Sequence, residues 1–465
     1  MLTIKDFIGT REFYKRVIIL AVPIMIQNGI TNFVNLLDNI MVGQVGMEQV
    51  SGIGIDNQLI YIFNLCIFGA ISGPGLFGAQ FFGKKDYEGV KSTFRFKIII
   101  CGIIGVLGIT IAVFFSDGLI GLYLHESDTT GDVALTLLSA KNYMMIMAIG
   151  FIPFSIMQVY TSTLREGGET MLPMKASAIA VLVNVVLNYI LIFGKFGVPA
   201  LGVVGAAIAT VIARWIECGI VVLWTHKHKE INHFIVGVYS SMHIPRPLAK
   251  KIMIIGAPLL LNETIWSMGL ALVTQSYSVR GLAVVAALSI CSTVINLCNV
   301  LFKGVGSSVA IIVGQLLGAN RFDEAKATAW KMIGFSVICG VIAATIMAVI
   351  APFFPEIYNT TETVKWYATS FILISAAIMP VSAFAFASYF TIRSGGKTLI
   401  TFMFDSGFVW VLSLPTAFIL SRFTGLPIIL VYGICQLLEI IKCVIAFTLI
   451  KKGIWVHNIA RNEEL

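Results

Sequence analysis

The stretch PIMIQNGITNFVNLLDNIMVG, from Pro23 to Gly43, sets the class of this protein. Its mostly apolar residues extend over about six helical turns, enough to cross roughly 30 Å of hydrocarbon. Similar apolar runs of about 20 to 30 residues follow along the whole chain. The twelve runs centre near Val34, Phe68, Ile104, Met147, Val183, Ala213, Met268, Ile295, Val341, Ala377, Val411 and Leu438. The sequence therefore predicts an all-α, polytopic membrane protein with twelve transmembrane helices.

The composition excludes a water-soluble fold. Of the 465 residues, 57% are hydrophobic and 12% charged, and the mean hydropathy is +0.90. Soluble domains have roughly 45–50% apolar and 25% charged residues.

The first apolar run lacks a small-residue cleavage site, so we expect it to be retained rather than removed as a signal peptide. The eight cysteines lie in apolar runs without a CxxC pair, which is typical of free, packed thiols.

The distribution of Lys and Arg predicts the orientation of the chain. With both termini inside, the cytoplasmic segments carry 25 of the 32 Lys and Arg residues, five of them between the second and third runs, and the outer segments carry five. Only Arg214 and Lys303 are assigned to the spans themselves. This excess obeys the positive-inside rule, so the net charge of +8 indicates topology and not a nucleic-acid partner. We expect a monomeric, multi-pass protein of the plasma (inner) membrane with both termini cytoplasmic.

The chain contains an internal duplication. At an offset of 235 residues, Gly, Pro and polar positions of the two halves match repeatedly. The pairs are Pro23 with Pro258, Gly46 with Gly281, Asn64 with Asn299, Gly69 with Gly304, Ser72 with Ser307, Gln80 with Gln315, Gly83 with Gly318 and Lys91 with Lys326. At an offset of 228, the hexapeptide REGGET (Arg165–Thr170) matches RSGGKT (Arg393–Thr398).

The duplication predicts the domain organisation. Six helices per half is an even number, so both halves enter the membrane from the same side, as parallel six-helix bundles related by pseudo-twofold symmetry. We expect an N-terminal half at 1–225, a cytoplasmic connector at 226–250 and a C-terminal half at 251–465. The connector contains His226 and His228, and although a His-x-His pair can bind metal, the Lys and Arg residues around it favour a solvated basic connector.

Small-residue motifs punctuate both halves. Gly73–Gly75 is expected to interrupt the second helix, and Gly304 with Gly306 the eighth, as hinges or close helix contacts. The two hexapeptides predict tight cytoplasmic turns in which Gly supplies a positive φ.

The sequence has no P-loop, HExxH or GxSxG, so we do not expect an enzyme. Two parallel halves favour a transporter whose central cleft opens alternately to each side.

The first candidate site residue is Asp38. An ionised carboxylate at mid-helix costs roughly 3 kcal/mol on insertion, so an acid within a span is a functional candidate by default. Gln27, Asn28, Asn35 and Asp38 recur at helical spacing and give one polar stripe that should face the bundle interior. The alternative is a solvated Asp38 at the outer headgroup level, next to the short loop after Gly43.

The second candidate is Glu263, in the run GAPLLLNETIWSMGLALV. It lies one and a half turns beyond Pro258, which removes a backbone hydrogen bond and can bend the helix toward the cleft. The alternative is a carboxylate near the cytoplasmic end that pairs with Lys250 or Lys251. Other charged residues of the spans are interpreted as structural: Asp405, Arg214 with Glu217, and Glu439 with Lys442.

Uncharged polar residues complete the predicted site. Asn184 and Asn188 are four residues apart on one helix face, and the next run adds Thr210. Such residues often join helices by hydrogen bonds, but next to a carboxylate they can hold its charged form or supply oxygen ligands to Na⁺. The residues expected to line a substrate cleft are Gln27, Asn35, Asn64, Trp266 and Asn299.

Several of these segments resemble one family. The segment ending LLDNIMVG at Gly43 is similar to the helix 1 signature of the multidrug and toxic compound extrusion (MATE) transporters. The two hexapeptides, AQFFGKKD from Ala79 and VNVVLNYILIFG from Val183 resemble other recurring segments of that family. The resemblance implies a secondary active antiporter that exports organic cations or amphipathic drugs and metabolites in exchange for H⁺ or Na⁺, without ATP or another cofactor.

The resemblance also implies roles for residues. Asp38 matches the coupling acid of the family's helix 1, with Asn184, Asn188 and Thr210 as its network, and Glu263 matches the helix 7 acid of some branches. An Na⁺ ion is accordingly implied at Asp38 or Glu263, and no other metal. Those branches often have a second acid in helix 10, which is missing from residues 369–393 here, and this absence weakens the case for a two-carboxylate sodium site.

A lipid or lipid-linked oligosaccharide flippase is the alternative function. Related families share a plan of twelve to fourteen helices, but a cleft for pyrophosphate should be lined by several Arg and Lys residues. With only Arg214 and Lys303 assigned to the spans, the sequence favours the antiporter.

Overall fold

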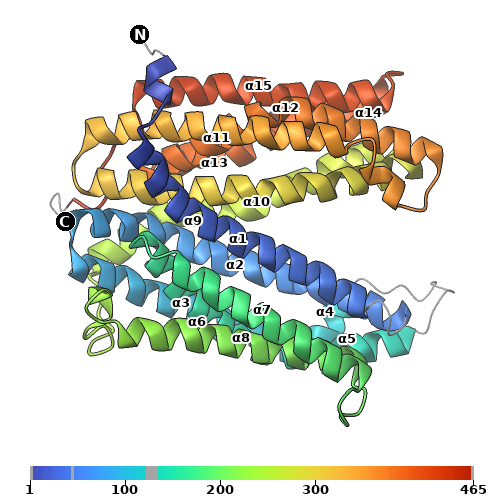
Figure 1. The fold of residues 1–465 in the computed structure, drawn as a ribbon, viewed down its shortest axis with the longest axis horizontal. Coiled ribbons are helices and arrows are strands. Elements are labelled where there is room, and N and C mark those ends of the chain that lie inside the picture. Colours follow the sequence, from blue (N-terminus) through green and yellow to red (C-terminus); the bar gives the residue numbers. More distant parts are fainter. Residues whose placement is uncertain (1–3, 43–46, 122–132, 462–465) are drawn as a thin grey trace. The chain divides into compact units, whose positions relative to one another are not determined.

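The computed structural model is entirely α-helical over the residues that it describes: 4–42, 47–121 and 133–461, without the side chains of 4–5, 34–40, 42, 47–51 and 133 (Figure 1). The α-helices are α1 (Arg11–Val42), α2 (Met47–Lys84), α3 (Tyr87–Phe114), α4 (Ser116–Gly121), α5 (Val133–Ile149), α6 (Phe151–Glu166), α7 (Met171–Phe193), α8 (Gly202–Lys227), α9 (Arg246–Ser278), α10 (Leu282–Gly318), α11 (Phe322–Ile350), α12 (Glu362–Ser394), α13 (Thr398–Phe402), α14 (Leu414–Phe423) and α15 (Ile428–Lys452). Short 3₁₀ turns lie at Ile4–Phe7, His233–Ile235 and Phe354–Ile357, and two π-helical turns, Met403–Gly407 and Val409–Ser413, join α13 to α14.

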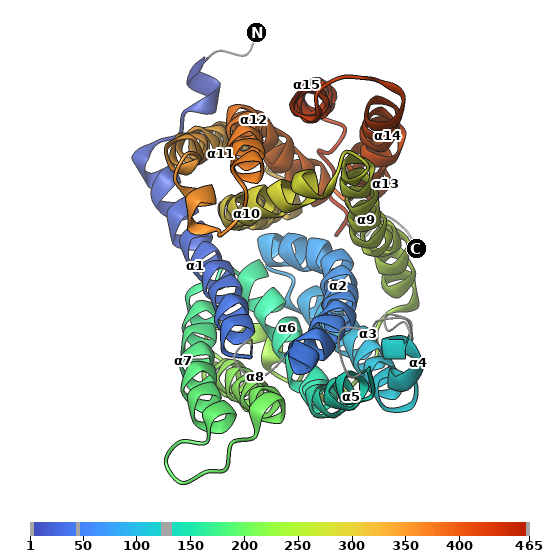
Figure 2. The same ribbon diagram turned by 90° about the vertical axis from the view of Figure 1, so that its right-hand side faces the viewer.

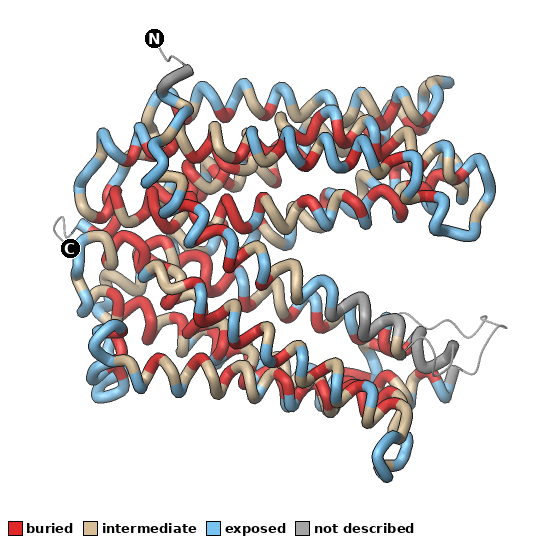
Figure 3. Tube along the Cα trace, in the orientation of Figure 1, coloured by how far each residue is buried: buried red, intermediate tan, exposed pale blue. Residues whose placement is uncertain are grey.

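The predicted membrane spans are confirmed. Within the described ranges, eleven helical segments are long and apolar enough to cross a bilayer, and the pair α5–α6 is a twelfth if it counts as one bent span. That pair bends by 44° at Gly150, where Pro153 in the first turn of α6 cannot donate a backbone hydrogen bond. Exposed and buried residues alternate along α11, and the exposed positions include Ile338, Val341 and Ile342, as expected for a face toward lipid (Figure 3).

The chain divides into two compact units. Unit 1 contains residues 1–25, 79–86 and 250–465, and unit 2 contains 26–78 and 87–249. The helices α1 and α2 therefore contribute to both units. In unit 2, α7 and α8 pack along their length, and in unit 1, α12 packs on α10, α11 and α15 (Figure 2). The division at residues 226–250 concerns the internal repeat and stays a prediction.

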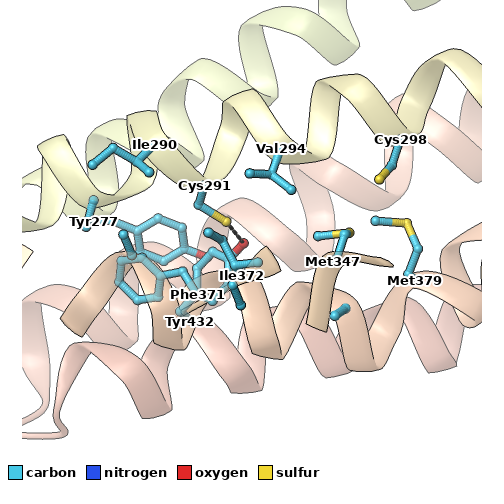
Figure 4. Packing of buried hydrophobic residues seen from close by; sticks show 14 of the residues in the cluster. Tyr277, Ile290, Cys291, Val294, Cys298, Met347, Phe371, Ile372, Met379 and Tyr432 are labelled. Carbon is cyan, nitrogen blue, oxygen red and sulfur yellow. Dashed lines mark hydrogen bonds between the residues drawn. The ribbon is translucent and has the colours of Figure 1, made fainter. Parts of the chain in front are cut away.

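A cluster of large apolar side chains forms the core of unit 1 between α9, α10, α12 and α15 (Figure 4). Phe371 and Tyr432 lie with their ring centroids 4.6 Å apart, and Cys291 lies 3.7 Å from the Ser375 hydroxyl. All eight cysteines are free, as the sequence predicts. Dense packing of this kind holds the helices of the unit in fixed register.

The expected helix interruptions are wrong, because α2 and α10 run through Gly73–Gly75 and Gly304–Gly306 without a break. Glycines in these stretches make close helix contacts, which was the other expectation. A Cβ on Gly78 would lie 2.0 Å from the Glu166 carboxylate, and one on Gly304 would lie 2.3 Å from the Met25 side chain. Helix breaking by glycine is weak, whereas in a membrane its small size lets neighbouring groups approach closely.

The two hexapeptides form the tight turns that the sequence predicts. REGGET joins α6 to α7 with Gly168 at φ 95°, and RSGGKT joins α12 to α13 with Gly396 at φ 76°. Only glycine adopts such angles without strain, which explains its presence at matching positions of both copies.

The ends of α2 and α10 cross through a reciprocal contact. A Cβ on Gly83 would lie 1.9 Å from the Gln315 carbonyl oxygen, and one on Gly318 would lie 1.9 Å from that of Gln80. The turns that follow are also matched, since Lys85 and Asn320 have φ values of 60° and 58°. The paired residues of the internal repeat therefore meet each other within unit 1.

We predict that Gly318→Ala destabilises the protein by about 1–3 kcal/mol, because the added methyl group meets a main-chain oxygen that cannot move aside. Gly102→Ala is the matched control, since the space around Gly102 in α3 is open to 4 Å. Thermal unfolding in detergent measures both, and equal midpoints for the two variants would contradict the crossing.

Candidate functional site

Three of the predicted site residues meet inside unit 2. The Asn184 amide donates to the Thr210 hydroxyl at 3.2 Å, and the Asn188 amide donates to the Asn184 carbonyl at 3.1 Å. Both asparagines are buried. Helices α7 and α8 can approach because a Cβ on Gly205 would lie 2.7 Å from the Leu191 main chain. The helical spacing read from the sequence thus places these amides together, and their role in ion binding stays a prediction.

Two of the predicted residues lie outside the described side chains. Asp38 and Asn35 belong to the helical backbone of α1, and their side chains are not described. The position of Asp38 relative to Asn184 therefore stays a prediction.

Gln27, which the sequence assigns to the substrate cleft, belongs to a chain of buried polar side chains. Its amide nitrogen donates to the Ser177 hydroxyl at 2.7 Å, and its amide oxygen accepts a hydrogen bond from Arg165. Ser177 in turn donates to Glu217. This chain links α1, α6, α7 and α8 by side-chain hydrogen bonds, which is costly to break inside a membrane protein.

The interpretation of Arg214 and Glu217 as structural residues agrees with their surroundings. Arg214 lies over the Phe154 ring, 5.1 Å from its centroid, and its guanidinium is 3.5 Å from the Gly150 carbonyl oxygen. Glu217 accepts a hydrogen bond from Ser177. Each charge thus contacts a neighbouring helix of unit 2.

A buried ion pair escaped the sequence prediction. Lys97, counted among the cations between the second and third runs, lies inside α3 with no exposed surface. Its ammonium is 2.6 and 2.7 Å from the two Glu166 oxygens, and the Ser162 and Thr163 hydroxyls complete its shell. Gly78 of α2 has no side chain, which leaves room for the Glu166 carboxylate. The sequence analysis placed Lys97 in the loop between the second and third spans, whereas α3 already begins at Tyr87. The ion pair was therefore not predicted.

Unit 1 holds a second ion pair, between the buried Lys442 and the half-buried Asp405, which corrects the expected partner of Lys442. Lys442 donates to Asp405 at 3.0 Å, instead of pairing with Glu439, which lies three residues earlier in the same helix. The Asn262 amide donates to the other Asp405 oxygen at 3.1 Å and to the Tyr389 hydroxyl at 3.2 Å. The α9 and α15 helices thus contact the carboxylate of the first π-turn, and α12 joins the cluster through Asn262.

The π-helical turn explains how Asp405 reaches this position. A π-turn adds a residue to the helix and redirects the side chains beside it, often at functional sites. Ser406, in the same turn, donates to the main-chain and side-chain oxygens of Asn262 at 3.1 and 2.7 Å. Both hydrogen bonds orient the Asn262 amide toward Asp405 and Tyr389.

Glu263 lies next to this cluster. It is half-buried, and the charges that act on it are those of Arg393, Asp405 and Lys303, rather than Lys250 or Lys251. The described part of the structure contains no ion pair or hydrogen bond of its carboxylate. Of the other predicted residues, Asn64, Trp266 and Asn299 are half-buried.

Asp56 in α2 is the most unusual acid that sequence reasoning missed. It has no exposed surface, and neither carboxylate oxygen has a hydrogen-bond partner among the described residues. Asp56 lies nine residues after Met47, where α2 begins, and is therefore inside the helix. The second run was centred near Phe68, so Asp56 appeared to lie at its edge.

The spans thus carry more charge than the sequence indicated. Besides Arg214, Lys303 and Lys442, the cations Lys97 and Arg393 lie within candidate spans. Lys97 and Lys442 pair with acids, and Arg393 lies over the Phe390 ring at 5.5 Å from its centroid. Ionisable residues inside helical spans are rare, and in membrane proteins they often mark the paths of substrates or ions.

These features define a multi-span helical membrane transporter. The chain belongs to the MatE family, whose model matches residues 23–190 and 258–419. The two matches begin at Pro23 and Pro258, the pair that the internal repeat aligns. The resemblance drawn from the sequence motifs is therefore confirmed, and with it the expectation that the chain is a transporter and not an enzyme.

Similar proteins span the whole chain. The probable multidrug resistance protein NorM of Bacillus licheniformis is 26% identical over 423 residues, covering 89% of this chain and 90% of that protein. NorM of Thermotoga maritima is 24% identical over 430 residues, covering 90% and 88%. Among solved structures, a MATE protein in complex with MaD3S superposes with a TM-score of 0.83 at 18% identity, over 97% of this chain and 98% of that one. This likeness supports the fold.

We predict that Lys97→Met destabilises the protein by about 3–5 kcal/mol, because it leaves the Glu166 carboxylate buried without its counter-ion. Adding Glu166→Gln to that variant should recover part of the loss, since the amide carries no charge. Lys91→Met is the control, because its partner Glu88 is 77% exposed and such pairs contribute little. Denaturant titration in detergent compares the variants, and a Lys97→Met protein as stable as Lys91→Met would refute the prediction.

Proposed function

We propose that this protein is a secondary active antiporter that exports organic cations or amphipathic drugs and metabolites in exchange for H⁺ or Na⁺. The match of the MatE family to both halves of the chain carries the proposal. Relatives that span almost the whole chain are named probable multidrug resistance proteins, which supports an amphipathic substrate class. No ATP and no cofactor besides the coupling ion take part, and alternating access exposes the binding groups to each side in turn.

In the N-terminal half, Asp38 is the proposed coupling acid. It takes up the ion from outside, which weakens its hold on the substrate cation, and it returns the ion to the cytoplasm in the inward-facing state. One negative charge then serves two ligands in turn, which makes the exchange obligatory. The hydrogen-bonded amides of Asn184 and Asn188, with the Thr210 hydroxyl, support this role, because oxygen-rich groups of this kind stabilise a carboxylate or ligate Na⁺.

In the C-terminal half, Glu263 is the proposed second exchangeable acid. Its half-buried carboxylate has no ion pair among the described residues, whereas the neighbouring Asp405 is bonded to Lys442 and Asn262. Asp405 is therefore a fixed charge and does not replace the acid that is missing from residues 369–393. We propose that Glu263 acts alone, without a two-carboxylate sodium site.

A flippase is less well supported. Recognition of pyrophosphate requires several unpaired cations. Lys97 and Lys442 are each paired with a carboxylate, and Arg165 donates to Gln27. These cations hold helices together in the described part of the structure, so they do not supply the Arg and Lys lining that a cleft for pyrophosphate needs.

The proposed setting follows the charge distribution. Both termini and the connector at 226–250 lie in the cytoplasm, and the protein works as a monomer in the plasma (inner) membrane. The excess of Lys and Arg in the cytoplasmic segments supports this orientation, since positive loops are retained on that side.

We predict that Asp38→Asn lowers ΔpH- or ΔNa⁺-driven ethidium efflux at least tenfold, because an amide cannot exchange its charge between two ligands. The measurement uses proteoliposomes with each gradient imposed separately, which also identifies the coupling ion. Asp117→Asn is the matched control, since this exposed acid pairs with Lys141 at 2.7 Å. Unchanged efflux by Asp38→Asn would overturn the role, and transfer of a labelled lipid without ethidium efflux would favour the flippase.

We predict that Glu263→Gln weakens binding of a monovalent organic cation about tenfold, because the half-buried carboxylate attracts it directly. Equilibrium binding of tetraphenylphosphonium to the purified protein measures the change. Glu439→Gln, another acid of the C-terminal half, should leave the affinity unchanged. Equal affinities for wild type and Glu263→Gln would remove this residue from the site.

A further inference from the structure

Asp56 lies on a fully packed strip of α2. Ile53, Ile60 and Phe63 share its helix face, and each of them is buried. The Asp56 side chain itself has no exposed surface, and neither of its oxygens has a hydrogen-bond partner in the described ranges. An acid thus occupies a position at which the rest of the strip is apolar.

The contacts on either side of Asp56 identify its surroundings. One turn earlier, a Cβ on Gly52 would lie 2.9 Å from the Thr136 carbonyl oxygen and 3.2 Å from the Ala140 side chain of α5. Two turns later, Phe63 stacks on Phe151 of α6, with ring centroids 4.1 Å apart. Asp56 therefore lies where α2 packs against α5 and the start of α6.

Phe63 also touches α3. A Cβ on Gly108 would lie 2.9 Å from its ring. The stretch Gly105–Ala112 of α3 carries no titratable side chain, and neither does Phe151–Ser155 of α6. The neighbouring faces of these two helices therefore offer Asp56 no counter-charge.

The remaining charges of this region have other contacts. On α5, Tyr143 is a buried phenol, and Lys141 pairs with the exposed Asp117 at 2.7 Å. On α8, Arg214 lies across the Phe154 ring and donates to the Gly150 carbonyl. The salt bridges of the described residues include none to Asp56. A carboxylate buried without a partner is strongly disfavoured, whereas a protonated carboxyl is tolerated.

We propose that Asp56 is a second proton-binding site of unit 2: its carboxyl holds a proton while α2 is packed against α5 and α6, and releases the proton when that interface opens to water. Ionisation and packing at this position exclude each other, because the described residues of the packed interface include no group that stabilises the charge. Proton binding at Asp56 is thereby coupled to the position of α2. Its part in transport rests on the proposed antiport function, whereas its protonation in the packed state does not.

Infrared difference spectroscopy tests the protonation directly. At neutral pH, the spectrum of wild type minus Asp56→Asn should contain the C=O stretch of a protonated carboxyl, shifted in D₂O. Asp117→Asn serves as the control and should remove only carboxylate bands, because Asp117 is 60% exposed beside Lys141. A wild type that lacks the carboxyl band at Asp56 would overturn the proposal, whatever the protein transports.

A transport measurement tests the coupling. Asp56→Asn keeps the packed interface neutral, so substrate counterflow should persist within about twofold while ΔpH-driven efflux falls at least fivefold. Thermal unfolding should be unchanged or shifted upward, because a neutral amide replaces an acid that must be protonated to pack. Undiminished ΔpH-driven efflux by Asp56→Asn, alongside a loss in Asp38→Asn, would overturn coupling at Asp56 while leaving the antiport itself intact.

Discussion

The hydrocarbon interior supplies no hydrogen-bond partners, and this constraint governs the structure. Main-chain groups satisfy themselves within helices, so polar side chains in the spans must find partners on neighbouring helices. They do so in groups: Lys97 with Glu166, Lys442 with Asp405, and the amides of Asn184 and Asn188 with Thr210. Each group joins helices that apolar contacts alone would hold less specifically. Against this background, Asp56 stands out as an acid that is buried with no partner for either carboxylate oxygen among the described residues.

The two halves have duplicated architecture but different chemistry. The hexapeptide turns, the glycine crossing and the family match occur in both copies. The buried charges do not, since Lys97 and Glu166 belong to unit 2 and Asp405 and Lys442 to unit 1, at unrelated places of the repeat. Backbone geometry thus persisted while side-chain pairs diverged.

The sequence predicted what depends on local pattern. Apolar runs gave the spans because their length must match the bilayer, and helical spacing placed Asn184 and Asn188 on one face beside Thr210. The sequence did not predict the partner of Lys442. Asp405 lies in a π-turn, and no local sequence pattern indicates such a turn. Lys97 and Asp56 were missed for another reason: helices extend beyond their apolar centres, so charges near the ends of a run read as loop residues. Glycines read as helix breaks were contact sites, because packing decides their effect.

The reciprocal crossing of α2 and α10 bears on the origin of the chain. Gly83 approaches the main chain at Gln315, and Gly318 approaches it at Gln80, so each residue of the repeat meets the counterpart of its own neighbour. Such a contact is isologous, the kind that two identical subunits make across a twofold axis. In two identical subunits, one glycine codon would shape both sides of such a contact at once. In this chain the two codons are separate, yet the fit between the backbones constrains both of them.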